Sequence, residues 1–89
     1  HIDTLFLGTN AIDLERGLST PNLEMANVKM KMIQNSRHKI LLADSSKIGR
    51  VSLARFAMLE QIDTLITDDG AEPAFLAALQ QMDVEVCTG

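Results

Sequence analysis

The stretch Ile40-Leu41-Leu42-Ala43-Asp44-Ser45-Ser46-Lys47 decides the fold, because four apolar residues are followed directly by an acid, two hydroxyls and a lysine. An apolar run of this length that ends abruptly in polar residues predicts a strand buried on both faces. In open α/β sheets the ligand crevice lies beyond the carboxyl ends of such strands. Asp44, Ser46 and Lys47 are therefore predicted to hold a small polar molecule.

The same residues also fit an ordinary capped turn, since Asp and Ser are common turn formers. In that interpretation Asp44 accepts hydrogen bonds from backbone N–H groups and Lys47 extends into solvent. The spacing alone leaves both interpretations open.

Composition limits the classes of protein to which this chain can belong. Its 89 residues form at most one domain or a part of one. The hydrophobic fraction of 46% and the charged fraction of 22% favour a globular fold over disorder. A net charge of −4 without a basic cluster argues against a chain that binds a phosphate backbone unaided.

The single cysteine, Cys87, excludes an intramolecular disulfide and a cysteine-rich zinc site. It fits a reducing, cytoplasmic setting, and its place in an apolar run indicates a small buried hydrophobe. No apolar run approaches the ~20 residues that a membrane span needs, so no membrane partner is expected.

The first half of the chain predicts a strand, a connection and a helix. Thr4–Leu7 has the pattern of a buried strand that ends in the turn Gly8-Thr9-Asn10, and 11–17 is expected to be an irregular connection. Residues 17–21 lead into a helix, with Ser19 or Thr20 as the cap and Pro21 at the first helical position. The helix is predicted over 23–36, with one face made by Met25, Val28, Met32 and Ile33.

The second half repeats this alternation. After the strand 40–43, the segment 51–59 fits a short strand plus a turn as well as it fits a helix. A strand over 62–67 and a helix that opens at Pro73 follow, and 84–86 is a last short strand. The inward residues of that helix are predicted to be Phe75, Leu76, Leu79 and Met82. Strands that alternate with helices predict an α/β fold, a parallel sheet with flanking helices and right-handed crossovers.

Two of these strands end in an acid, Asp44 and Asp68. Carboxylates at adjacent strand ends can bind sugar hydroxyls, a metal ion or backbone amides. The metal signal is weak because no His or Glu stands beside them at ligand spacing. The glycine patterns of nucleotide-binding loops are missing too, so neither a metal nor a cofactor is expected.

Anion binding is the chemistry that the remaining residues favour. The segment Gly17-Leu18-Ser19-Thr20-Pro21 places hydroxyls and free N–H groups at a predicted helix N-terminus, which is an anion site. Lys47 adds a mobile positive charge from a neighbouring strand end. A phosphorylated molecule with hydroxyl groups would find donors at both places, and Asp44 would accept from a hydroxyl.

Catalysis is less well supported. A serine nucleophile needs a base, and His38 precedes the strand whose far end carries Ser45 and Ser46, so no triad is expected. His38 is interpreted as a surface residue at a helix C-terminus. Glu24 is a candidate general base if it reaches the crevice, although an acid near a helix N-terminus is favourable without any catalytic role.

Four separated blocks of this chain resemble the effector-binding domain of the DeoR-family transcriptional regulators. They occur in the family's order and spacing and are 6–8, 17–21, 42–49 and 62–68. The resemblance covers essentially the whole chain. It implies a fold similar to ribose-5-phosphate isomerase and the glucosamine-6-phosphate deaminases. It also implies a sensor of phosphorylated sugars or related metabolites within a repressor of sugar or nucleoside catabolism.

The resemblance also suggests roles for single residues. It implies that Lys47 and Asp44 contact the ligand, that Gly8 and Asn10 line the same crevice, and that Glu24 falls where the isomerase carries its base. The glycine-rich segment of the isomerase begins with a catalytic lysine, whereas Glu15-Arg16-Gly17 has none. This difference favours binding without catalysis.

Regulators of this family also carry a winged helix-turn-helix and a first half of the sensor domain with an Asp-Gly-Thr-Thr-like phosphate loop. Neither occurs in these residues. We therefore expect 1–89 to be the C-terminal part of an effector-binding domain, with DNA contacted only through the absent N-terminal domain. One flank of the sheet is then exposed unless a partner or a second copy covers it, and a homo-oligomer is expected.

Two other functions stay open at this point. One is a sugar-phosphate isomerase-like enzyme on the same fold, with Glu24 as its base. The other is a structural remnant that binds nothing tightly and only assembles into dimers or tetramers.

Overall fold

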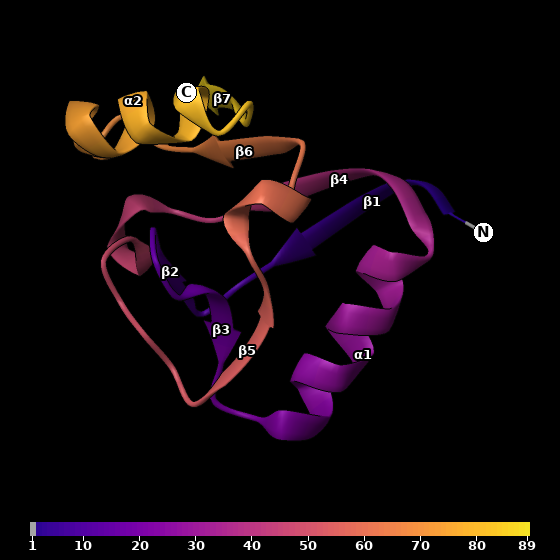
Figure 1. The fold of residues 1–89 in the computed structure, drawn as a ribbon. Coiled ribbons are helices and arrows are strands. Elements are labelled where there is room, and N and C mark those ends of the chain that lie inside the picture. Colours follow the sequence, from indigo (N-terminus) through magenta and orange to yellow (C-terminus); the bar gives the residue numbers. More distant parts are fainter. Residues whose placement is uncertain (1) are drawn as a thin grey trace.

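The structure is a computed structural model that describes residues 2–89. Three strands come first, and from α1 onwards helices and strands alternate along the chain (Figure 1). In chain order the elements are β1 (Ile2–Gly8), β2 (Ala11–Asp13), β3 (Gly17–Thr20), α1 (Leu23–Gln34), β4 (Ser36–Leu42), the 3-10 helix η1 (Ser45–Lys47), β5 (Ala54–Ala57), the 3-10 helix η2 (Leu59–Gln61), β6 (Thr64–Thr67), α2 (Pro73–Gln81) and β7 (Glu85–Thr88).

The main sheet has four strands in the order β1-β4-β6-β7, and every pairing in it is parallel. Leu7, Leu41 and Leu65 lie side by side in register and are buried. They belong to one core cluster with residues of α1, α2 and the smaller sheet, among them Ile33, Leu79 and Phe56. The predicted α/β fold with a parallel sheet is confirmed.

The other face of the main sheet is open in the described part of the chain. Phe6 is 59% exposed, Leu42 43% and Ile66 37%, and strand residues alternate between the two faces. The prediction that the strand around 40–43 is buried on both faces is therefore wrong. Cys87 is also exposed, in register with Ile66, and is not the buried hydrophobe that was expected. All-parallel sheets normally have both faces covered, so this face is unusual for the fold.

A second, antiparallel sheet has the order β2-β3-β5 and replaces the irregular connection predicted for 11–17. Gly17 makes it possible: its φ is +82°, and a Cβ at this position would lie 2.3 Å from the Ala57 carbonyl oxygen. Within 51–59 the interpretation as a strand followed by a turn is confirmed by β5 and η2.

Helix α1 begins at Leu23, as its predicted span did, but its cap differs from the prediction. Asn22 is its N-cap, and the Asn22 Oδ1 atom accepts a hydrogen bond of 3.0 Å from the Met25 backbone N–H. Ser19 and Thr20 lie in β3 instead, so the predicted helical anion site over 17–21 is wrong. Ser19 and Thr20 do not cap the helix, because the segment that follows Gly17 forms a strand of the second sheet.

The buried face of α1 agrees with the prediction in part, since Ile33 is buried and Met32 packs against the core. Ala26 and Ile33 are buried, seven residues apart on one side of the helix, while Met25 and Val28 are exposed. The helix ends at Gln34, and β4 already begins at Ser36 (Figure 1).

His38 therefore lies in a strand and not at a helix C-terminus, although it is exposed as expected. Helix α2 agrees with its prediction: Phe75 and Leu79 are buried and Leu76 packs against the core. None of the helices in 2–89 is long and apolar enough to cross a membrane.

Candidate functional site

The turn after β4 is built by its own side chains. The Asp44 Oδ1 atom accepts a hydrogen bond of 2.9 Å from the Ser46 backbone N–H and another from the Ser46 hydroxyl. These bonds, the one from the hydroxyl first, lower the pKa of the Asp44 carboxyl. The Lys47 Nζ atom lies 3.9 Å from the Asp44 Oδ2 atom. The capped turn that the spacing allowed is therefore formed, with Lys47 beside the acid.

Asp68, at the end of β6, ties this turn to the neighbouring strand. Its Oδ2 atom accepts a hydrogen bond of 2.9 Å from the Ser45 backbone N–H, and its Oδ1 atom accepts one of 2.8 Å from the Gly70 backbone N–H. The bond from Ser45 is the main reason why the pKa of Asp68 is lowered. The two strand-end acids therefore bind backbone amides. Among residues 2–89 no group of three His, Cys, Asp or Glu side chains is arranged to hold a metal ion.

The end of β1 is fastened by contacts with distant parts of the chain. The Lys29 Nζ atom, from α1, donates a hydrogen bond of 2.6 Å to the Gly8 carbonyl oxygen. The buried Thr9 hydroxyl donates to the Ser19 carbonyl oxygen at 3.1 Å. The Thr20 hydroxyl donates to the Asn10 Oδ1 atom at 2.9 Å. The turn Gly8-Thr9-Asn10 is thus held on β3 and α1.

Five of the predicted ligand residues lie at the same edge of the main sheet, where β1 and β4 end. Gly8 is paired with Leu42 in the parallel register of β1 and β4, so the turns that follow these two strands lie at the carboxyl ends of neighbours. Gly8 and Asn10 lie in the first turn, and Asp44, Ser46 and Lys47 in the second. That these residues bind a ligand stays a prediction.

The two other predicted residues are placed differently. Glu24 is exposed in the first turn of α1. Gly17 is buried, and because a Cβ at this position would clash with the Ala57 carbonyl oxygen, the glycine lets β3 pack against β5.

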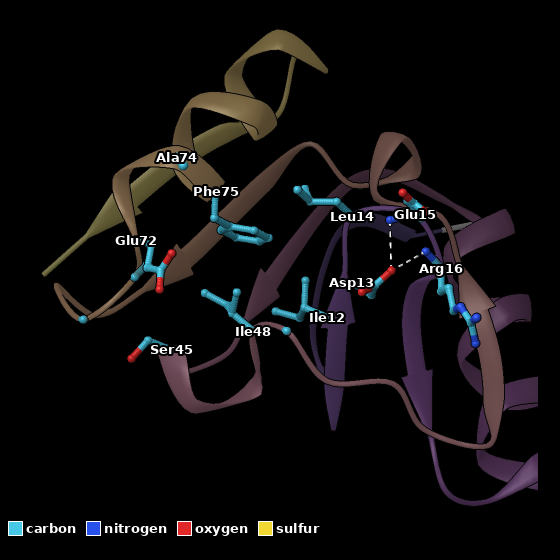
Figure 2. A pocket seen from close by; sticks show the side chains of 13 residues that line it. Ile12, Asp13, Leu14, Glu15, Arg16, Ser45, Ile48, Glu72, Ala74 and Phe75 are labelled. Carbon is cyan, nitrogen blue, oxygen red and sulfur yellow. Dashed lines mark hydrogen bonds between the residues drawn. The ribbon is translucent and has the colours of Figure 1, made fainter.

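A pocket of about 720 Å³ lies between the β2–β3 turn, the η1 segment and the start of α2 (Figure 2). Ile12, Ile48 and Phe75 point toward one another inside it. Asp13 shapes its other wall, since the Asp13 Oδ2 atom accepts hydrogen bonds from the backbone N–H groups of the next turn.

None of the seven predicted ligand residues lines this pocket. The sequence does contain one indication of the turn that forms a wall of this pocket. The stretch Asp13-Leu14-Glu15-Arg16-Gly17 has an acid and a glycine around a short polar turn, which is typical of a hairpin.

Lys29 was also missed, although it lies at the edge that the sequence singled out. Its Nζ atom is 5.0 Å from the centroid of the Phe56 ring, and partial burial lowers the pKa of its ammonium group. Only the packing of α1 against β1 and β5 brings it to the end of β1.

Comparison with known proteins identifies the family. Residues 1–69 match the family described as the DeoR C terminal sensor domain. The whole chain is 43% identical to the HTH-type transcriptional regulator GlpR of Haloferax volcanii and covers 35% of that protein. Over 97% of the chain it is 42% identical to a putative aga operon transcriptional repressor of Escherichia coli O157:H7, covering 32% of it.

A third relative is the HTH-type transcriptional repressor GlcR of Bacillus subtilis, which is 40% identical over 97% of the chain and is covered to 33%. The chain thus spans about a third of the length of these curated relatives. These relatives are named as transcriptional regulators or repressors, and their names do not support the isomerase-like alternative with Glu24 as a base. The chain belongs to the DeoR family of transcriptional regulators, in the C-terminal sensor domain of that family.

Proposed function

We propose that this chain is part of the effector-binding domain of a transcriptional repressor of sugar metabolism and that it senses a phosphorylated sugar or a related metabolite. Membership of a regulator family supports the regulatory role. The observation that carries the ligand class is the turn after β4. This turn holds an ammonium group, a hydroxyl and a carboxylate together at the carboxyl end of a parallel strand.

The geometry of this turn suits a phosphate with neighbouring hydroxyls. The Lys47 side chain is 33% exposed, and its distance of 3.9 Å from Asp44 is longer than a hydrogen bond. Its N–H donors are therefore available to a phosphate, to which lysine presents a compact positive charge. Asp44 is kept ionised by its hydrogen bonds and can accept from a sugar hydroxyl. Asn10 offers an amide from the neighbouring turn.

We also propose that 1–89 is the C-terminal part of this domain and that a preceding segment of the regulator covers the open face of the sheet. Phe6, Leu42 and Ile66 give this face an apolar surface, which a parallel sheet normally buries. The relatives are about three times as long as the chain, which leaves ample polypeptide for the purpose.

The rest of the mechanism follows from the same proposal. DNA is contacted only through an N-terminal helix-turn-helix domain outside these residues, in keeping with relatives that are named HTH-type. Effector binding shifts a conformational or oligomeric equilibrium of a homo-oligomer, and the DNA-binding domain responds to that shift. The protein acts in the cytoplasm, where DNA and phosphorylated sugars occur together.

Thermal unfolding of the intact regulator tests the ligand class. Phosphorylated sugars such as glucose 6-phosphate and fructose 1-phosphate are compared with glucose and fructose at equal concentration. A cognate ligand at 100 times its Kd is expected to stabilise the folded state by about 2.7 kcal/mol, because it binds only that state. The ligand class is wrong if no phosphorylated compound raises the unfolding temperature, or if the parent sugars raise it equally.

The variant Phe6→Ala tests the domain proposal. In the isolated chain the free energy of unfolding should change by less than about 0.5 kcal/mol, because Phe6 is an exposed side chain. In the intact regulator the loss should reach about 3–5 kcal/mol, as for a phenylalanine in a core. An equally small loss in both proteins would show that no other segment covers this face.

A further inference from the structure

We propose that Lys29 is a second contact for the anionic group of the effector, so that lysines from two elements, α1 and the turn after β4, bind one anion. This inference rests on the proposed function and adds a residue that the turn after β4 does not contain. The anion is a phosphate or a carboxylate, which present the same oxygen acceptors to an ammonium group.

The position of the Lys29 ammonium group is the first argument. It donates a hydrogen bond of 2.6 Å to the Gly8 carbonyl oxygen, at the carboxyl end of β1. An ammonium group has three N–H donors, so two more are left for a ligand. Gly8 is paired with Leu42, two residues before Asp44, and the ammonium group therefore lies at the same edge of the sheet as the turn that carries Lys47.

The charge of Lys29 is the second argument. Its side chain is partly buried against the Phe56 ring, 5.0 Å from the ring centroid. No carboxylate oxygen of the described residues lies within 4.0 Å of the Lys29 Nζ atom, whereas Lys47 has Asp44. Partly buried charges in proteins are normally paired, and the lowered pKa of Lys29 reflects the cost of burial without such a partner. A bound anion would supply the missing charge.

A purely structural role is the alternative. Lys29 fastens α1 to β1 through Gly8 and to β5 through Phe56, and this alone would make it important for folding. The two roles differ in one measurable respect. An anion contact discriminates a phosphorylated ligand from its parent sugar, while a residue that only positions the Gly8–Asn10 turn changes the affinity of both ligands equally.

The experiment is calorimetric titration of the intact regulator and its Lys29→Met variant with inorganic phosphate, glucose 6-phosphate, gluconate and glucose. Methionine keeps the length of the side chain and removes the charge. We expect the variant to bind the anionic compounds about 10- to 100-fold more weakly, as for loss of a charged hydrogen bond, and to bind glucose unchanged. A loss confined to the two phosphate compounds identifies a phosphate contact, and a loss confined to gluconate identifies a carboxylate contact.

Lys31→Met is the matched control, because Lys31 is an exposed lysine on the same helix, and its affinities should equal those of the wild type. If Lys29→Met does not fold, Lys29→Arg keeps the charge with a different geometry and should still discriminate anions from glucose. Equal losses for anions and glucose, or no loss at all, would overturn the inference and leave the proposed function intact. A wild-type protein that binds neither phosphate compound nor gluconate would overturn both.

Discussion

The two turns at the carboxyl edge of the main sheet differ in the sequence distance of their side-chain contacts, although the turn after β4 is also bonded to Asp68 at the end of β6. In the turn after β4, Asp44 contacts Ser46 and Lys47, which are two and three residues away. In the turn after β1, Asn10 contacts Thr20 and Gly8 contacts Lys29, over ten and 21 residues. A local turn can be recognised from adjacent letters of the sequence. A turn that is assembled from distant elements leaves no such pattern.

The two turns also differ in the groups that lie near the positive charge of the lysine that contacts each of them. Lys47 has a carboxylate nearby, and Asp44 is stabilised in its ionised form by two hydrogen bonds. Lys29 has a carbonyl oxygen and an aromatic ring instead. A pair of opposite charges is nearly neutral to an approaching ligand, whereas an uncompensated cation attracts anions. The following predictions test this difference between the turns.

The largest effect is expected from Gly17→Val, which should disrupt the long-range turn. The new Cβ would meet the Ala57 carbonyl oxygen at 2.3 Å, and valine is strained at a φ of +82°. We expect a loss of about 3 kcal/mol or more in the free energy of unfolding, measured by urea denaturation. Gly49→Val is the control, since Gly49 has a φ of +85° but open space around it, and should cost only about 1–2 kcal/mol. Equal losses would mean that β3 does not depend on the close approach at Gly17.

The next largest effect is expected from Lys47→Ala in the local turn. Loss of one charged hydrogen bond to the effector should weaken binding by about 1.5–3 kcal/mol. Stability should stay within about 0.5 kcal/mol of the wild type, because Lys47 lies in an exposed turn. Titration with the phosphorylated sugar that stabilises the protein measures the first quantity. An unchanged affinity would show that Lys47 is a solvated turn residue that does not contact the effector.

A smaller effect is expected from Thr20→Val in the long-range turn. The substitution keeps the shape of the side chain and removes the hydrogen bond of 2.9 Å to Asn10. The expected loss of stability is about 1 kcal/mol. Thr4→Val, on the exposed face of β1, should change stability by less than about 0.5 kcal/mol in the same denaturation experiment. If both variants behave alike, the hydrogen bond between Asn10 and Thr20 contributes nothing.

The smallest effect is expected from Asp68→Asn, and its difference in stability from the wild type should disappear in acid. The hydrogen bond from the Ser45 backbone N–H lowers the pKa of Asp68 in the folded state below its ordinary value of 3.8. The stability that this bond confers is fully present above pH 3.8 and is lost as the pH falls through the lowered folded pKa. The unfolding temperature of the variant should therefore fall less steeply than that of the wild type below pH 3.8. Parallel curves would show that this bond does not contribute.

Several elements could be predicted from the sequence for a clear physical reason. Helix α2 follows from Pro73 and from the spacing of Phe75 and Leu79, which places both on one face. The strands β1, β4 and β6 were recognised because each has apolar residues in a short run before a polar turn. Only the prediction that both faces of the strand at 40–43 are buried was wrong, because an apolar run has the same pattern whether one face or both faces are covered.

The second sheet could not be predicted, because its strands are short and pair with residues far along the chain. Leu18 is opposite Ala57, and Ser19 is opposite Arg55. Ser19 and Thr20 are common helix caps, and the local signal therefore indicated a helix start. The pairing with β5 outweighs this local preference, and Ser19 and Thr20 lie in a strand.

The main-sheet strands β1, β4 and β6, helix α2 and the capped turn after β4 follow from the sequence, because each depends on residues that are close together in the chain. The open face of the sheet, the pocket beside α2 and the place of Lys29 next to Gly8 exist only in the folded molecule. These features depend on which distant residues meet. That outcome is decided by the packing of whole elements on one another, and no short stretch of sequence contains it.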